Sequence, residues 1–209
     1  VVVALNKLLN ANLSVEELVS IAAQGESASA GSPHADNVAP AIVGGFTIVN
    51  YGEKINVLKL KPPKNMKIAV VVPDVEIPHN KTEVARFILP KHIPLNSMVK
   101  NVGRAAAMVA SLLMANVDLL GKFMVDEVVE PVRASLVPGY KQVKIKALEA
   151  GASGVAISGA GPSMIAIVNS GRVNPWNVAI AMKKALEDIG VKAEAYVAEV
   201  SDGAELVKE

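Results

Sequence analysis

The pattern of apolar and polar residues predicts a succession of helices and strands along the whole chain. Apolar residues at helical spacing, and the S-x-x-E capping box formed by Ser14 and Glu17, predict helices at residues 1–9, 14–23 and 38–43. Apolar runs that follow Gly44-Gly45 predict strands at residues 46–50 and 54–60. The next segment, Lys61-Pro-Pro-Lys-Asn65, has the composition of a linker.

After residue 65 the pattern restarts. Strands are predicted at residues 67–72, 154–158, 164–169 and 192–199, and helices at 81–89, 95–115 and 175–189, with a helical insert at about 117–150. Without the insert the order is β-α-β-β-α-β, which is the ferredoxin-like order. We therefore expect an α+β fold made of two domains, residues 1–65 and 66–209.

Composition narrows the class of protein. The chain has 209 residues, 51% of them hydrophobic, which is enough for a sizeable core. Its net charge of +1 gives no reason to expect nucleic acid or an anionic membrane as a partner. The absence of cysteine excludes disulfides, thiolate metal sites and a cysteine nucleophile. The longest apolar stretch, residues 105–120, is interrupted by Asn116 and Asp118 and is short for a membrane span, so we expect a cytoplasmic protein.

The segment from Gly25 to Phe46 is the strongest candidate for a functional site. It is predicted to be a loop of small residues that leads into an apolar segment, and it carries four polar side chains: Glu26, His34, Asp36 and Asn37. Polar groups gathered on a loop between rigid elements are typical of a small-molecule site.

Three further segments carry less information when each is taken alone. The glycine-rich run at 158–163, S-G-A-G-P-S, is neither a Walker A loop nor a dinucleotide-binding fingerprint, and by itself it predicts a turn between two buried strands. The run K-T-E-V-A-R at 81–86 predicts a helix start with a surface arginine. The run E-P-V-R at 130–133 ends in an arginine that would ordinarily be exposed.

Taken together and in this order, the four segments resemble the homoserine kinase branch of the GHMP kinases, a family of small-molecule kinases. The resemblance rests on E-x₇-H-x-D-N-V-x-P-A-x-x-G-G-F, K-T-x-x-A-R, E-P-x-R-x-x-L-x-P and S-G-A-G-P-S, which extend over nearly the whole chain. It implies the GHMP kinase fold, with residues 1–65 as the C-terminal part of the N-terminal domain and 66–209 as the ferredoxin-like C-terminal domain. It also implies transfer of the γ-phosphate of ATP to the side-chain hydroxyl of L-homoserine, a step of threonine biosynthesis.

The resemblance assigns substrate-binding roles residue by residue. Arg86 and Arg133 would bind the substrate carboxylate, for which the arginine fork is well suited. Asp36 would bind the ammonium group beside His34, and Asn37 would orient the hydroxyl that attacks the phosphate. No residue stands out as a general base, and His34 is a candidate that we expect to bind substrate instead.

The resemblance also assigns the phosphate side of the site. Glu26 would bind Mg²⁺, with Thr82 nearby, since Mg²⁺ takes one or two carboxylates together with phosphates and water. Glu26 and Asn37 are thus the expected catalytic residues. The glycine-rich run would lie near the phosphates and the substrate, through Ser158, Gly159, Ala160, Gly161 and Ser163.

One family element is not found in this sequence. The ATP-binding run P-x-x-x-G-L-G-S-S-A, which in the family precedes the helix that resembles residues 1–9, is absent, and the chain opens on apolar residues without an initiator Met. We therefore expect a truncated chain that has no kinase activity by itself. Two alternatives remain open: another GHMP kinase, of the mevalonate or shikimate type, and a ferredoxin-like binding module without catalysis. The oligomeric state is open as well, with a homodimer as one option.

Overall fold

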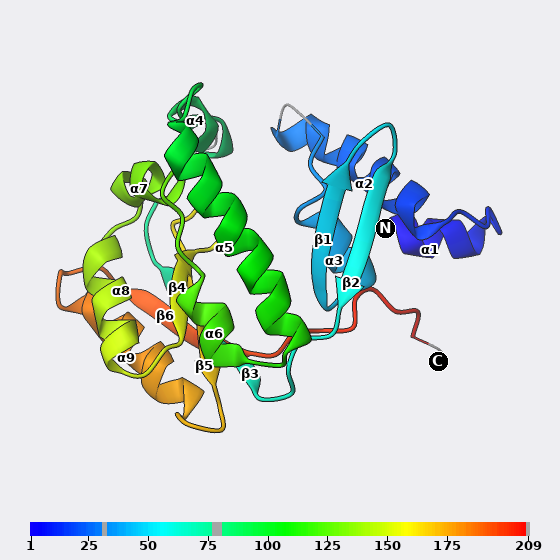
Figure 1. Cartoon of the computed structure of the whole chain (residues 1–209). Helices are drawn as coiled ribbons and strands as arrows, with labels where there is room; N and C mark the ends of the chain where they lie inside the picture. Colours follow the sequence, from blue (N-terminus) through cyan, green and yellow to red (C-terminus); the bar gives the residue numbers. More distant parts are fainter. Residues whose placement is uncertain (31–32, 77–80, 208–209) are drawn as a thin grey trace. The chain divides into compact units, whose positions relative to one another are not determined.

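The computed structural model describes residues 1–30, 33–76 and 81–207 (Figure 1). The chain divides into two compact units, one formed by residues 1–62 together with 200–209, the other by 63–199. The predicted domains, 1–65 and 66–209, differ from these units at residues 63–65 and at residues 200–207, the latter of which belong to the first unit. Those residues join the first unit because Gly45 N–H donates to Ser201 O at 2.8 Å and Lys59 Nζ to Asp202 O at 3.3 Å.

The first unit contains three helices and a hairpin among the residues described. Its elements are α1 (Val2–Leu8), α2 (Val15–Ala30), α3 (Val38–Val43), β1 (Phe46–Tyr51) and β2 (Ile55–Leu60), and the two strands pair antiparallel. The predicted capping box is present, since Ser14 N–H donates to Glu17 Oε2 at 2.8 Å and Glu17 N–H to Ser14 Oγ at 3.2 Å. The buried core of this unit is small and consists of Val19, Ala23, Ala35 and Ala39.

The second helix corrects part of the sequence-based expectation. We predicted that it would end at Ala23 and that residue 25 would begin a loop, but α2 continues through Ala30. Alanine, serine and glutamate are compatible with a helix, nothing lies within 4 Å of the missing side chain of Gly25, and the first proline comes only at Pro33. Glu26 therefore lies on a helix and not in the loop.

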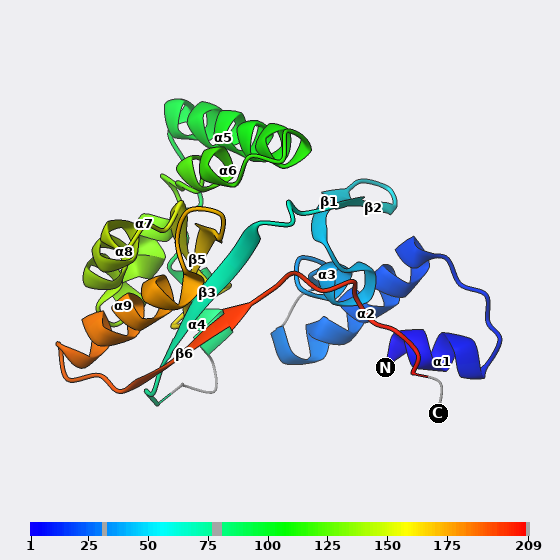
Figure 2. The same ribbon diagram turned by 90° about the horizontal axis from the view of Figure 1, so that it is seen from below.

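The second unit is built on a four-stranded antiparallel sheet (Figure 2). Its strands are β3 (Met66–Pro73), β4 (Gly154–Ile157), β5 (Met164–Asn169) and β6 (Ala193–Ala198), arranged in the order β4-β5-β3-β6. The central strand β3 pairs Val70 with Ile165 on one side and with Tyr196 on the other. The first and last strands in sequence are thus neighbours, as in the ferredoxin-like order, and the α+β prediction is confirmed.

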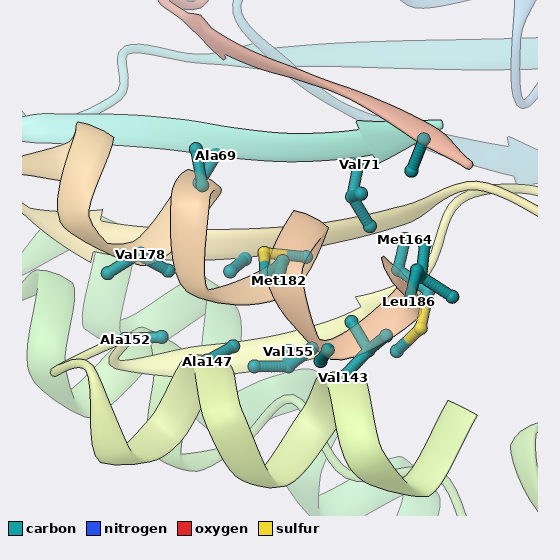
Figure 3. Close-up of a cluster of buried hydrophobic side chains, with 14 of the residues drawn as sticks. Ala69, Val71, Val143, Ala147, Ala152, Val155, Met164, Val178, Met182 and Leu186 are labelled. Atoms are coloured by element: carbon teal, nitrogen blue, oxygen red, sulfur yellow. The ribbon is translucent and has the colours of Figure 1, made fainter. Parts of the chain in front are cut away.

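Several helices accompany the sheet of this unit. They are α4 (Lys81–Phe87), α5 (Leu95–Leu113), α6 (Val117–Lys122), α7 (Glu130–Arg133), a 3₁₀ turn (Ala134–Leu136), α8 (Tyr140–Glu149) and α9 (Pro175–Glu187). Helices α8 and α9 pack on each other and on the sheet, and they bury Val143, Ala147, Val178 and Met182 against Ala69, Val155 and Met164 (Figure 3). In the sequence-based prediction α8 belonged to the insert at 117–150, whereas in the structure it packs on the sheet as part of the main core; α6 also contacts β4 and β5.

None of the described helices is both long and apolar enough to cross a membrane.

Candidate active site

In the first unit, three of the predicted site residues lie side by side just before α3. Their position is fixed by Ala35, which is fully buried and whose backbone N–H donates to Tyr51 Oη at 2.8 Å. His34 is half-buried, while Asp36 and Asn37 are exposed. Asn37 is the N-cap residue of α3, yet its side chain makes no capping hydrogen bond. The buried Ala35 thus anchors the segment and leaves the side chains of Asp36 and Asn37 at the surface of the unit.

Glu26 belongs to a different element from these three residues. It is half-buried on α2, whose core face packs against α3 through Val19 and Ala23. The position of its carboxylate is therefore set by the packing of two helices and not by a loop.

In the second unit, Arg133 joins two of the predicted segments. Its Nε donates to the carbonyl of Ala85 at 3.3 Å, and its Nη1 donates to the carbonyl of Gly159 at 3.2 Å. Ala85 is fully buried and precedes Arg86 on α4, while Gly159 belongs to the glycine-rich run. The structure thus brings the K-T-x-x-A-R, E-P-x-R and S-G-A-G-P-S segments together at one arginine.

The glycine-rich run is a tight turn between β4 and β5. Ser158 N–H donates to Ser163 O, and Gly161 N–H donates to Ser158 O, both at 2.9 Å. Gly159 (φ +56°) and Gly161 (φ +79°) adopt the left-handed conformation that favours glycine. Nothing lies within 4 Å of the missing side chain of Gly159, so its exposed backbone can be approached closely. Ser158, Ala160 and Ser163 are half-buried beside it.

A buried ion pair supports the helix that carries Arg133. Glu130, 8% exposed, begins α7 and accepts a hydrogen bond from Lys144 Nζ on α8 at 2.9 Å. The same Nζ donates to Tyr140 Oη at 3.0 Å. Burial lowers the pKa of Lys144, but the contacts with Tyr140 and Glu130 outweigh it and raise this pKa above its usual value. Sequence reasoning gave Glu130 no role, although its place at the start of E-P-x-R was the available signal.

Asp126 fixes the start of the same helix. Its carboxylate accepts hydrogen bonds from the backbone N–H groups of Val128 at 2.7 Å, Val129 at 3.1 Å and Glu130 at 3.3 Å, and from Asn101 Nδ2 of α5 at 2.8 Å. Burial raises the pKa of the Asp126 carboxyl, but these hydrogen bonds together outweigh it and hold the pKa below its usual range. Sequence reasoning missed this residue, whose signal was an aspartate just ahead of a Glu-Pro helix start.

The described residues contain no group of three or more His, Asp or Glu side chains that could hold a metal ion. Mg²⁺ is usually held by one or two carboxylates with phosphates and water, so it does not require such a group. Glu26, a half-buried carboxylate, has suitable chemistry for one such ligand. The side chain of Thr82, the second predicted magnesium residue, lies outside the part of the chain that the structure describes.

The predicted site residues thus divide between the two units. Glu26, His34, Asp36 and Asn37 belong to the first unit. Arg86, which is half-buried on α4, belongs with Arg133 and the glycine-rich run to the second.

Comparison with known proteins adds independent information. The profile of the GHMP kinases N terminal domain matches residues 1–45, and that of the GHMP kinases C terminal matches residues 107–174. The homoserine kinase of Methanocella arvoryzae is 42% identical over 98% of this chain and 65% of its own length. The homoserine kinase of Halorubrum lacusprofundi is 39% identical over 99% of this chain and 67% of its own length.

A solved structure agrees with these relatives. The crystal structure of homoserine kinase from Cytophaga hutchinsonii matches with a TM-score of 0.86 and 40% identity, over 95% of this chain and 62% of that one. This chain therefore spans less than two thirds of the length of several of the proteins that it resembles.

Proposed function

The chain belongs to the GHMP kinase family, and we propose that the protein containing it transfers the γ-phosphate of ATP to the side-chain hydroxyl of L-homoserine. The observation that carries this proposal is the setting of Arg133. Its guanidinium donates only to two backbone carbonyls and, among the described residues, forms no ion pair with a carboxylate. An arginine held in place but not neutralised is suited to bind the carboxylate of an amino-acid substrate.

We assign the remaining substrate contacts by charge. Arg86 lies one residue after Ala85, whose carbonyl positions Arg133, so it is placed to contribute the second guanidinium for the carboxylate. Asp36, an exposed carboxylate, would bind the ammonium group, with His34 beside it. These assignments account for both charged groups of homoserine, of which galactose has neither and mevalonate and shikimate have only the carboxylate.

Asn37 would orient the reacting hydroxyl. Its side-chain amide is not used to cap α3, so it can accept or donate a hydrogen bond to the substrate. In the reaction the hydroxyl oxygen forms a bond to the γ-phosphorus, the bond from that phosphorus to the β–γ bridging oxygen breaks, and ADP and a proton leave. Since the transition state is loose, alignment and charge neutralisation contribute most of the acceleration.

The phosphate side of the proposal involves a metal ion. Glu26, together with Thr82, would hold Mg²⁺, which neutralises phosphate charge when it is bound. The exposed backbone of Gly159 and the neighbouring Ser158 and Ser163 would lie against phosphate oxygens or the substrate, because a turn with bare backbone allows close approach. A cytoplasmic location and a role in threonine biosynthesis follow from the same proposal.

A substrate panel tests the proposal. The chain, joined to the part of the Methanocella arvoryzae relative that it does not match, is assayed for ADP formation with Mg-ATP and L-homoserine, mevalonate, galactose or shikimate. We expect turnover with L-homoserine at a kcat/KM at least about 100-fold above the others, because mevalonate and shikimate lack the ammonium group and galactose lacks both charged groups, which leaves polar groups of the site unpaired. Equal or better turnover of a non-amino-acid substrate would overturn the assignment.

A further inference from the structure

The second unit contains a cavity most of whose lining residues have no role in the proposed reaction. Its volume is about 440 Å³, within the range of small-molecule sites. It is lined by one side of α5, by the segment 123–130 that leads into α7, and by Ala156 and Ile157 of β4. Arg133 and Gly159 also line it, so it adjoins the proposed substrate-binding arginine.

Most of the wall is apolar, formed by side chains such as Met108, Phe123, Val125 and Ile157. The two carboxylates in the lining are already engaged within the protein. Asp126 accepts four hydrogen bonds, and Glu130 is paired with Lys144. The lining therefore offers a ligand an apolar surface and no unpaired anion among the residues that the structure describes.

Arg104, one of the two arginines in the lining, has a guanidinium whose hydrogen bonds are incomplete. Arg104 of α5 donates from Nη2 to Glu127 Oε1 at 2.7 Å, but its Nη1 is buried and has no hydrogen-bond partner in the described parts of the chain. A buried cationic N–H without an acceptor is unfavourable. The side chain as a whole is 25% exposed, so a turn of the guanidinium toward the cavity would give Nη1 an acceptor if an anion were bound there.

We propose that this cavity binds a small monocarboxylate with a branched apolar body. The carboxylate pairs with Arg104, whose Nη1 then gains its missing acceptor. The body of the ligand lies against Met108, Phe123 and Ile157. Arg133 remains available to the substrate, and because it lines the same cavity, a bound ligand alters the surroundings of the substrate-binding arginine.

Binding of 3-methylbutanoate to the 209-residue chain tests this proposal without requiring kinase activity. Ligand-observed NMR is recorded for 3-methylbutanoate and for its uncharged analogue 3-methylbutanamide. We expect saturable binding of the acid and at least tenfold weaker binding of the amide. Equal binding of the two, or no binding of the acid, would overturn the proposal.

Two variants with one matched control locate the site. Arg104→Lys keeps a cation beside Glu127 but removes the guanidinium, and we expect it to weaken binding of 3-methylbutanoate at least tenfold. Lys100→Met removes the other cation that pairs with Glu127, at 3.1 Å, but Lys100 does not line the cavity, so this variant should bind as the unaltered chain does. Ala105→Leu narrows the cavity from α5 without altering charge and should also weaken binding.

Competition with homoserine separates this site from the substrate site. A saturating concentration of L-homoserine should leave the 3-methylbutanoate signal in place. Displacement of the acid by homoserine, or unchanged binding in both Arg104→Lys and Ala105→Leu, would contradict a separate ligand site at Arg104. Failure of the kinase assay, in contrast, would not affect the binding result.

Discussion

The guanidinium of Arg133 donates a hydrogen bond to the carbonyl of Gly159, and this contact joins two segments that are 26 residues apart in the sequence. A second hydrogen bond, from Nε to the carbonyl of Ala85, extends the connection to α4. The arginine is thereby held by backbone groups, which do not neutralise it. The same contacts that fix its position leave its charge unpaired with a carboxylate among the described residues, which is what the role proposed for it requires.

The ion pair between Glu130 and Lys144 should stabilise the unit that carries Arg133. Lys144→Met leaves the buried Glu130 without its partner, and we expect a loss of about 2–3 kcal/mol in the free energy of unfolding. This lies below the range for fully buried pairs because the Lys144 side chain is 25% exposed. Denaturant unfolding measures the change.

A matched control lies on the same helix. Lys146 pairs with Glu149 at 2.8 Å, but both side chains are more than half exposed. Lys146→Met should therefore change the free energy of unfolding by less than about 1 kcal/mol. If the two variants lost the same stability, the pair at Glu130 would not have the structural role assigned to it.

Asp126 should give stability a defined pH dependence. Because hydrogen bonding lowers its pKa in the folded protein, the ionised carboxylate stabilises the fold at neutral pH, and this contribution disappears as pH falls through the lowered folded-state pKa. Asp126→Asn should cost about 1–3 kcal/mol at pH 7. The difference in the free energy of unfolding between the unaltered protein and Asp126→Asn should be full above the unfolded-state pKa of about 4 and should become smaller below it.

Unfolding measured across pH 2–8 checks this prediction, with the exposed Asp188→Asn as the control. We expect the control to show no comparable gap. A gap between Asp126→Asn and the unaltered protein that stayed constant down to pH 2 would show that the ionised form contributes nothing.

Substitutions of glycine should separate backbone strain from crowding in the S-G-A-G-P-S turn. Gly159→Ala places a side chain in open space at φ +56°, whereas Gly161→Ala at φ +79° also brings it within 3.0 Å of Val137 Cγ2. Gly159→Ala, which adds strain alone, should lower the free energy of unfolding by about 1–2 kcal/mol. Gly161→Ala should lower it by about 1 kcal/mol more because of the added crowding.

Gly103→Ala, inside α5 with nothing within 4 Å, is the control and should stabilise the protein by about 0.5–1 kcal/mol. Thermal unfolding of the three variants gives the order of their stabilities. The assignment of strain to this turn fails if Gly159→Ala and Gly161→Ala are as stable as Gly103→Ala.

Much of the architecture was predictable because it depends on local pattern. The strand at Met164–Asn169 and the helix at Val38–Val43 have the predicted bounds, since glycine and polar residues delimit them clearly. The extension of α2 past Gly25 was not predictable in this way, because Gly and Ser favour a loop only weakly and the alanines and Glu26 among them are compatible with a helix.

The arrangement of the candidate site was less predictable than its residues. Sequence motifs identified Arg133 and the glycine-rich run, but not that a side chain on α7 would bond to the carbonyl of Gly159. Lys144 escaped notice because its partner, Glu130, lies on another helix and meets it only after folding. The contact of Asp126 with Asn101 is of the same kind, although its backbone partners are local and offered a signal that was overlooked. Contacts of this kind follow from tertiary packing, which periodicity does not encode.

The proposed binding of the substrate carboxylate by Arg133 is tested most directly when the arginine and the carboxylate are removed separately and together. The chain is joined to the part of the Methanocella arvoryzae relative that it does not match, and kcat/KM is measured for L-homoserine and for 3-aminopropan-1-ol, which lacks the carboxylate. The measurement is made with the unaltered sequence and with Arg133→Ala. We expect Arg133→Ala to lower kcat/KM for homoserine by roughly 10- to 100-fold and that for 3-aminopropan-1-ol by no more than about twofold. An equal loss with both substrates would contradict the claim.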